Sequence, residues 1–170
     1  MSRRDGLRLE RLGDDHDLAG FDSGQPDLDR WLQRHAFAAQ KRDSARTFLL
    51  MDDDRTVGYF SLTMASVRRQ DAPARLVRGL PGYPVGAVLL ARLAVSRADQ
   101  GRGLGGQLLT EALRRAVAAG EQAAARLVIV DAINEEAASF YRYLGFIAAP
   151  EHDLRLYRRV SDIRASLPDR

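Results

Sequence analysis

Four glycines in one short segment carry the clearest chemical signal in this sequence. The segment Gln100-Gly101-Arg102-Gly103-Leu104-Gly105-Gly106 follows an apolar run at residues 88–95, and an amphipathic stretch begins directly after it. Glycines allow a backbone to approach a phosphate closely, and the first-turn N–H groups of a following helix supply a positive field. A strand, a glycine loop and a helix in this order therefore predict an anion site.

Several anion sites use glycine loops, and their contexts differ. Gly101, Gly103 and Gly106 satisfy the G-x-G-x-x-G dinucleotide pattern, but that pattern belongs on the first strand of two mononucleotide-binding halves, and too little chain follows Gly106. A Walker A loop is excluded because no Gly-Lys-Ser/Thr closes it. A glycine-rich turn without a ligand remains the structural alternative.

The elements around this loop follow from hydrophobic periodicity and turn residues. Two connecting segments lie between these elements. They are a polar turn at residues 52–55 and a basic loop at residues 68–84, which has room for a short helix. The expected helices are residues 28–39 with Pro26 in the first turn, residues 108–117 ending near Gly120, and residues 135–144 capped by Gly145. The expected strands are residues 8–12, 47–51, 56–63, 88–95, 126–130, one around Phe146, and 154–160.

Composition narrows the chemistry further. The chain has 170 residues, 45% of them apolar, with no cysteine and only three histidines, His16, His35 and His152. Thiolate metal sites and a cysteine nucleophile are thereby excluded, and the histidine spacing predicts no catalytic metal. Residues 1–4 do not lead into the apolar segment of a signal peptide, and no apolar run is long enough to cross a bilayer. We expect a single domain over residues 1–170, in the cytoplasm and away from membranes.

A second motif lies downstream of the glycine loop. Residues 132–146 read Ala-Ile-Asn-Glu-Glu-Ala-Ala-Ser-Phe-Tyr-Arg-Tyr-Leu-Gly-Phe, which is similar to the N-x-x-A-x-x-F-Y-x-x-x-G-F signature of the GNAT N-acetyltransferases. Gln100-x-x-Gly103-x-Gly105 resembles the acetyl-CoA diphosphate loop of the same superfamily. Each motif lies on the expected kind of element, and the resemblance covers essentially the whole chain.

This resemblance implies an α/β chain of the α+β type: a mixed, mostly antiparallel central sheet with splayed central strands, flanked by helices. It implies acetyl-CoA as cofactor. Main-chain groups of Leu93, Ala94 and Val95 would bind the pantetheine arm, and Asn134 would bond the cofactor near its thioester. The diphosphate loop would comprise Gln100, Arg102, Gly103, Leu104, Gly105 and Gly106.

The resemblance also implies that Tyr141 protonates the departing thiolate as general acid. An ordinary packing aromatic is the alternative for Tyr141, and Tyr143 is a neighbouring candidate. No convincing general base emerges, since Glu111 and Asp131 both suit structural roles. An α-amino acceptor tolerates this, because its reference pKa of about 7.7 to 8.0 leaves a neutral fraction at cytoplasmic pH.

Motifs outside the cofactor signature resemble the GNAT toxins of bacterial type II toxin–antitoxin modules. They are Phe21-Asp22-Ser23-Gly24-x-x-x-Leu28-Asp29-x-Trp31-Leu32, Val57-Gly58-Tyr59-Phe60-Ser61-Leu62, and Tyr83-Pro84-Val85 before residues 90–95; Gly86 is a minor departure. This resemblance implies acetylation of the α-amino group of aminoacyl-tRNA, which blocks translation. It also implies that the chain forms a homodimer and that a ribbon-helix-helix antitoxin neutralises it. Operator DNA would be contacted only through the antitoxin.

Arginine usage agrees with an RNA substrate. Of 26 basic side chains only Lys41 is a lysine, and guanidinium forks suit phosphate recognition, although a codon bias would give the same count. We predict that Arg75, Arg78 and Arg92 contact tRNA. The alternatives are a GNAT enzyme acting on a small amine or protein N-terminus, which predicts an acidic acceptor pocket, and a non-catalytic acetyl-CoA-binding module.

Overall fold

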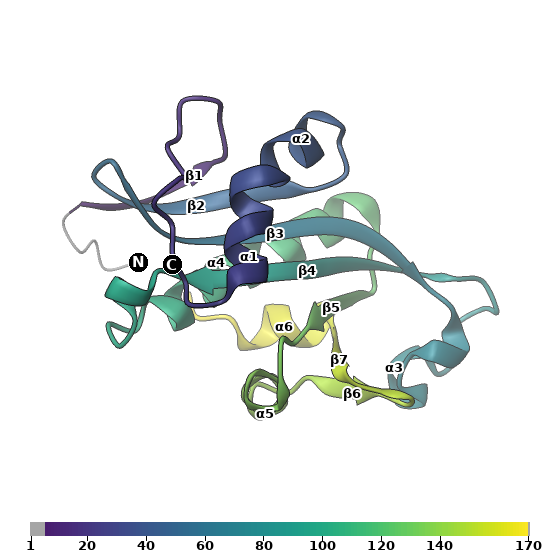
Figure 1. The fold of residues 1–170 in the computed structure, drawn as a ribbon. Helices are drawn as coiled ribbons and strands as arrows, with labels where there is room; N and C mark the ends of the chain where they lie inside the picture. Colours follow the sequence, from purple (N-terminus) through teal and green to yellow (C-terminus); the bar gives the residue numbers. More distant parts are fainter. Residues whose placement is uncertain (1–5, 170) are drawn as a thin grey trace. The chain divides into compact units, whose positions relative to one another are not determined.

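The computed structural model describes residues 6–169 and contains a seven-stranded sheet with helices (Figure 1). The strands are β1 (Leu7–Arg11), β2 (Arg46–Asp52), β3 (Arg55–Val67), β4 (Val85–Val95), β5 (Leu127–Asp131), β6 (Ile147–Ala149) and β7 (His152–Arg159). The helices are α1 (Pro26–Arg34), α2 (Ala36–Lys41), α3 (Ala74–Val77), α4 (Leu104–Ala123), α5 (Glu135–Tyr143) and α6 (Val160–Ser166), with single 3-10 turns η1 (Arg69–Asp71) and η2 (Arg97–Asp99).

The strand order is β1-β2-β3-β4-β5-β7-β6. The pairs β1–β2, β2–β3, β5–β7 and β6–β7 are antiparallel, whereas β4 and β5 are parallel. The expected mixed, mostly antiparallel sheet is therefore confirmed. The β4–β5 register ends where Leu90 pairs with Val130, although β4 itself continues to Val95.

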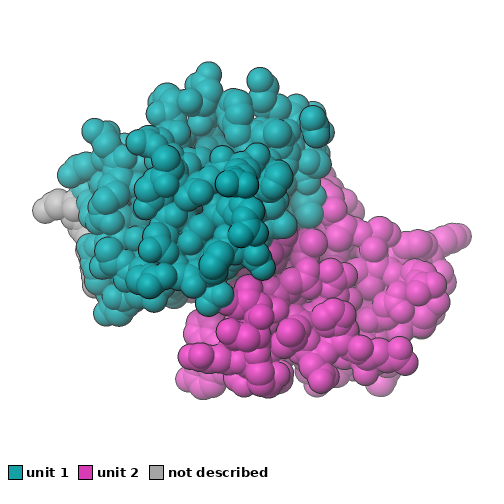
Figure 2. All heavy atoms as spheres, viewed as in Figure 1, with its two compact units in different colours: residues 1–63, 92–112, 170 teal, residues 64–91, 113–169 magenta. Residues whose placement is uncertain are grey.

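The chain divides into two compact units, which Figure 2 colours separately. Within the described residues, the first unit comprises 6–63 and 92–112, and the second comprises 64–91 and 113–169. Strands β3 and β4 and helix α4 each contribute residues to both units. Each unit has its own apolar core.

The core of the first unit joins α1 and α2 to the strands β2 and β3. Leu28 and Leu32 of α1 pack in one buried cluster with Leu49 of β2 and Tyr59 of β3. Gly58, the neighbour of Tyr59, lies against Leu108 of α4 instead. Since successive strand residues face opposite sides, β3 is covered by α1 on one face and by α4 on the other.

The core of the second unit lies between the short helix α3 and the strands β4, β5 and β7. Leu76 and Val77 of α3 are buried with Ala87, Ile129 and Tyr157. The basic segment expected to be a long loop therefore contains η1 and α3, and the apolar side chains of α3 anchor it. Its arginines are left at the surface.

Three element predictions need correction. The helix expected at residues 28–39 is divided into α1 and α2, because His35 leaves the helical conformation with φ −124° and ψ −26°. Helix α4 does not end near Gly120 but continues to Ala123, and Ala124 takes the left-handed turn with φ +59°. The strand expected to include Val160 ends at Arg159, since Val160 begins α6.

Gly120 has a packing role in place of the expected cap. A Cβ at this position would lie 3.3 Å from Cγ2 of Val160 and 3.5 Å from Cβ of Ala125. Contacts that tight leave little room for any side chain. The glycine therefore allows α6 and the Ala125 segment to approach α4 closely.

Candidate functional site

The glycine loop has the backbone geometry of an anion cradle. Gly101 and Gly103 have φ of +84° and +75°, a left-handed region that other residues rarely adopt. Helix α4 begins at Leu104, so the N–H groups of its first turn lack partners within the helix. A Cβ added at Gly101, Gly103 or Gly106 would meet nothing within 4 Å, so the surface of the loop is open.

The side chain of Gln100 hydrogen-bonds this loop to other segments of the first unit. Its side-chain Nε2 donates to the carbonyl oxygens of Ser23 and Val95, both at 3.0 Å. Both amide hydrogens are thus used by the protein, and the carbonyl of Val95, expected to face the cofactor, already accepts one of them. Gln100 therefore has a scaffolding contact that its motif alone did not reveal.

The N-terminal motif builds the support for that contact. The Asp29 carboxylate accepts from the Ser23 hydroxyl at 2.6 Å and from the Ser23 N–H at 3.0 Å. Phe21 packs edge-on against Tyr59 with ring centroids 5.7 Å apart. Residues of this N-terminal motif thus hold the segment to which Gln100 is hydrogen-bonded.

Two further residues at this loop were missed by the sequence reasoning. Asp99, the residue before Gln100, is 2% exposed and accepts hydrogen bonds from Arg55 of β3 and from Arg102 of the loop. Adjacency to the motif was the only signal that pointed to Asp99. No pattern in the sequence links Arg55 to a residue so far along the chain.

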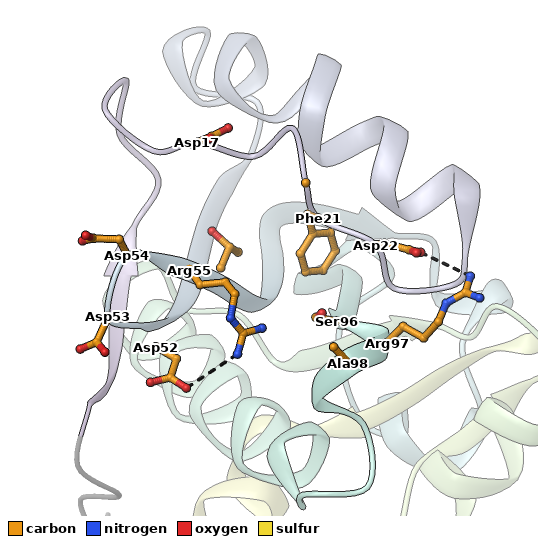
Figure 3. Close-up of a pocket in the computed structure, with 12 residues that line it drawn as sticks. Asp17, Phe21, Asp22, Asp52, Asp53, Asp54, Arg55, Ser96, Arg97 and Ala98 are labelled. Atoms are coloured by element: carbon orange, nitrogen blue, oxygen red, sulfur yellow. Dashed lines mark hydrogen bonds and ion pairs between the residues drawn. The ribbon is translucent and has the colours of Figure 1, made fainter.

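A pocket of about 830 Å³ lies beside η2 in the first unit, and Figure 3 shows the residues that line it. Carboxylates dominate its rim, and Asp22 and Asp52 form ion pairs with Arg97 and Arg55 at 3.4 and 3.8 Å. Its lining ends at Ala98, before the glycines. Because five aspartates surround it, this pocket disfavours phosphate, and the open face of the loop remains the candidate anion site.

In the second unit, α5 presents the other motif. Asn134 is the N-cap of α5, and its Oδ1 accepts from the N–H of Ala137 at 2.9 Å. Its side-chain amide group is what remains to donate to a ligand. Gly145, the penultimate residue of the motif, has φ +92°, as expected for the residue after a helix.

Tyr141 and Tyr143 occupy opposite environments. Tyr143 is 87% exposed, whereas Tyr141 is 9% exposed and packs edge-on against Phe146 with ring centroids 5.8 Å apart. Burial raises the pKa of the Tyr141 phenol to about 12. Tyr141 therefore keeps its proton throughout the neutral range.

Asp131, one of the two carboxylates considered as a general base, has a structural partner. Its oxygens accept from Nε and Nη2 of Arg155 at 2.8 and 2.9 Å, a bidentate pair between β5 and β7. Both oxygens of Asp131 are therefore already engaged within the protein. The pair instead fixes the ends of two adjacent strands.

The three predicted RNA-contacting arginines are not equivalent. Arg75 and Arg78 are exposed on and just after α3, and within residues 6–169 neither forms a hydrogen bond or ion pair. Arg92 belongs to the other unit, and its guanidinium lies 4.0 Å from the centre of the Trp31 ring. Arg75 and Arg78 are thus available to an external anion, whereas Arg92 has an aromatic partner.

Comparison with known families identifies the class of protein. The profile of the acetyltransferase (GNAT) family matches residues 12–146, which include both motifs. The chain belongs to this family. The open glycine loop fits the diphosphate of acetyl-CoA, since it offers backbone N–H groups and no side chain that would fill the space.

Relatives of known activity define the branch of the family. The chain is 40% identical over 159 residues to a tRNA-acetylating toxin of Mycobacterium tuberculosis (strain ATCC 25618 / H37Rv), covering 94% of this chain and 95% of the relative. AtaT in complex with acetyl-methionyl-tRNAfMet superposes with a TM-score of 0.84 at 28% identity, over 94% of this chain and 98% of that one.

Structures of AtaT with other partners are also similar. A mutant of AtaT bound to the C-terminus of the antitoxin AtaR and to acetyl-CoA matches with a TM-score of 0.80 at 27% identity, over 97% of this chain and all of that chain. The AtaT–AtaR complex bound to DNA matches with a TM-score of 0.75 at 27% identity, over 93% and 97%. Among the described residues, no helix is long and apolar enough to cross a membrane.

Proposed function

We propose that this chain is an acetyl-CoA-dependent N-acetyltransferase toxin that acetylates the α-amino group of aminoacyl-tRNA and so blocks translation. The observation that carries the proposal is the 40% identity to a tRNA-acetylating toxin, which extends over 94% of the chain. Arg75 and Arg78 support it, because both are exposed and have no ion-pair partner in the described part of the chain, and tRNA recognition needs cations that can meet phosphates.

The glycine loop would hold the diphosphate of the cofactor. First-turn N–H groups of Leu104, Gly105 and Gly106 would donate to the phosphate oxygens, together with those of Arg102 and Gly103. Main-chain groups of Leu93, Ala94 and Val95 would receive the pantetheine arm in the manner of an added strand. The amide group of Asn134, whose oxygen already caps α5, would donate to the cofactor near its thioester.

When bound, acetyl-CoA supplies the acetyl group as an activated thioester. Tyr141 holds its proton on the phenolic oxygen at neutral pH and would give it to the departing sulfur. The acceptor amine would form the new C–N bond as the C–S bond of the thioester breaks, its proton would pass to water, and Tyr141 would regain a proton from water. Arg155 keeps the Asp131 carboxylate occupied, so the neutral fraction of an α-amine takes the place of a protein base.

Further proposals concern the partners and the setting of the reaction. We propose that a ribbon-helix-helix antitoxin neutralises the chain and that operator DNA is contacted only through it. We also propose that the chain forms a homodimer and that residues 1–170 form a single acetyltransferase domain. We propose a cytoplasmic location for it. Light scattering of the purified protein, alone and with its antitoxin, measures the two stoichiometries.

The deciding experiment measures acetyl transfer from labelled acetyl-CoA to total charged tRNA. We expect label to enter charged tRNA and to be absent from deacylated tRNA. Free amino acids, peptides and small amines are offered in parallel reactions. Labelling of one of these acceptors with none in charged tRNA would reject the toxin proposal while leaving an acetyltransferase.

A further inference from the structure

A buried carboxylate lies at the point where the diphosphate loop leaves the sheet. Asp99 ends η2, between β4 and Gly101, and its side chain is 3% exposed. Nη1 and Nη2 of Arg55 donate to its two oxygens at 2.5 and 3.0 Å, and Nη1 of Arg102 donates at 2.8 Å. One carboxylate therefore binds the start of β3 and the middle of the glycine loop at the same time.

Two guanidinium groups share this one carboxylate, and both are far more exposed than it is. The side chains of Arg55 and Arg102 are 53% and 41% exposed, so both guanidinium groups remain partly hydrated. The bond from Arg55 is the largest of the influences that hold the pKa of Asp99 below its usual range, and it outweighs the opposing effect of burial. Asp99 is thus a charged anchor throughout the neutral range.

The ion pair with Asp99 matters for the ligand because of where Arg102 lies in the loop. Arg102 lies between Gly101 and Gly103, the two left-handed residues of the loop. A loop with two such glycines has many accessible conformations, and fixing one of them costs conformational entropy. A side-chain bond in the middle of the loop, to a buried carboxylate that the sheet holds, removes much of that freedom before a ligand binds.

We propose that Asp99 is a positioning residue for acetyl-CoA: through Arg55 and Arg102 it presets the glycine loop in the conformation that receives the diphosphate. The inference rests on the proposed function only for its cofactor. Asp99 itself does not touch the ligand, because a carboxylate beside a diphosphate would repel it.

The sign of the effect separates this role from simple electrostatics. The change Asp99→Asn removes a negative charge and the ionic partner that Arg55 and Arg102 share, so a charge effect alone would make an anionic ligand bind more tightly. Loss of positioning predicts the opposite, since the loop would have to be ordered when the ligand binds. Weaker binding therefore supports positioning, and unchanged or tighter binding overturns it.

The experiment compares Asp99→Asn with wild type by calorimetry with acetyl-CoA and by steady-state acetylation of the acceptor accepted by the wild type. We expect KM and Kd for acetyl-CoA to rise about tenfold, with kcat at saturating acetyl-CoA within about twofold of wild type. Asp162→Asn, which breaks the 2.9 Å ion pair between Arg159 at the end of β7 and Asp162 of α6, is the control and should change neither constant. Failure of wild type to bind acetyl-CoA would count against the proposed function, not against the role of Asp99.

A truncated donor localises the effect on the cofactor. S-acetylpantetheine lacks the diphosphate, so wild type and Asp99→Asn should use it with the same kcat/KM. A loss with this donor equal to the loss with acetyl-CoA would mean general damage to the fold and would overturn the proposal.

The partner arginine provides a second route should Asp99→Asn fail to fold. Arg55→Gln leaves Asp99 paired with Arg102 and should raise KM for acetyl-CoA in the same direction, and Arg55→Lys should recover part of the loss. In the double variant the two losses should not multiply, because Arg55 acts through Asp99. Multiplying losses would overturn the linkage.

Discussion

The glycine loop and helix α5 both carry motifs of the acetyltransferase family, but they present opposite kinds of chemistry. Side chains in and before the loop are turned to the protein itself: Gln100 bonds two carbonyls, and Arg102 bonds a buried carboxylate. The loop therefore offers its ligand a backbone. On α5 the backbone forms a capped helix, and the predicted chemistry belongs to a side chain, the buried phenol of Tyr141.

This difference predicts how each region fails. Substitutions in the loop should act on cofactor binding, whereas substitutions on α5 should act on the rate of transfer. A family signature thus contains two kinds of residue: those expected to contact the ligand and those that stabilise the folded chain. Only the contacts in the folded chain separate the two kinds.

The largest effect is expected from Gly103→Asp. The new side chain would occupy the open space before the first turn of α4, and its carboxylate would repel the diphosphate. We expect the affinity for acetyl-CoA, measured by calorimetry, to fall by at least about 100-fold.

Gly79→Asp is the matched control for that change. Gly79 has φ +80° and open space around its Cα, so it imposes the same backbone strain outside the cofactor loop. Its affinity for acetyl-CoA should equal that of wild type. Equal losses in both variants would mean that strain, not the diphosphate, explains the effect.

Tyr141→Phe should produce the next largest effect, this time on the rate. Loss of a general acid typically slows a reaction by about 10² to 10⁴, so we expect kcat to fall about 100-fold or more with little change in KM for acetyl-CoA. Tyr143→Phe, at an 87% exposed position, should be silent. Wild-type turnover by Tyr141→Phe would remove the phenol from the mechanism, and a higher KM alone would contradict the division between the two regions.

Much of this architecture was accessible from the sequence, for a physical reason. Periodic apolar residues and turn glycines are local signals, and they placed the hairpin, the central strand, the glycine loop and α5. The same local signals failed at His35, where nothing in the residue types marks the break between α1 and α2. They also failed at Gly120, whose close contact with Val160 is made by a distant part of the chain.

The site shows the same limit. Tyr141 and the loop glycines stand in contiguous motifs, so the sequence could name them as candidates, and their roles stay predictions. Arg55 and Asp99 are far apart in the chain and meet only in the folded structure, so no spacing rule reveals their pair. Likewise, sequence alone did not distinguish the exposed Arg75 and Arg78 from Arg92, which is stacked on Trp31.

Arg75 and Arg78 extend the comparison to side chains that have no hydrogen-bond or ion-pair partner among residues 6–169. The double change Arg75→Gln and Arg78→Gln should weaken aminoacyl-tRNA binding about tenfold at physiological salt. It should also reduce the slope of log affinity against log salt by about one to two, since each phosphate contact contributes slightly less than one. Filter binding across a salt series measures both, and acetyl-CoA affinity should not change.

Net charge needs its own control in that experiment. Arg11 and Arg34 are exposed in the other unit, and changing both to Gln removes the same two charges. This control should alter tRNA binding far less. Equal weakening by both pairs would mean that overall charge attracts the RNA and that the α3 segment is not its track.

The smallest expected effect concerns alkaline pH, where the rate of acetyl transfer should reach a plateau and not fall. Burial raises the pKa of Tyr141 to about 12, so the phenol stays protonated well above the reference value of about 10. The rate of transfer at saturating substrates should rise with pH as the acceptor amine loses its proton, with an apparent pKa near the amine reference of about 8. It should then stay level to about pH 9.5, because the general acid is not yet titrated.

Rapid-quench single turnovers avoid hydrolysis of the aminoacyl ester during the measurement. Tyr141→Phe should give the same profile at a lower level. A falling limb near pH 9 that is present in wild type and absent from Tyr141→Phe would show that the phenol ionises early, and it would contradict the account of α5 as the holder of a firmly bound proton.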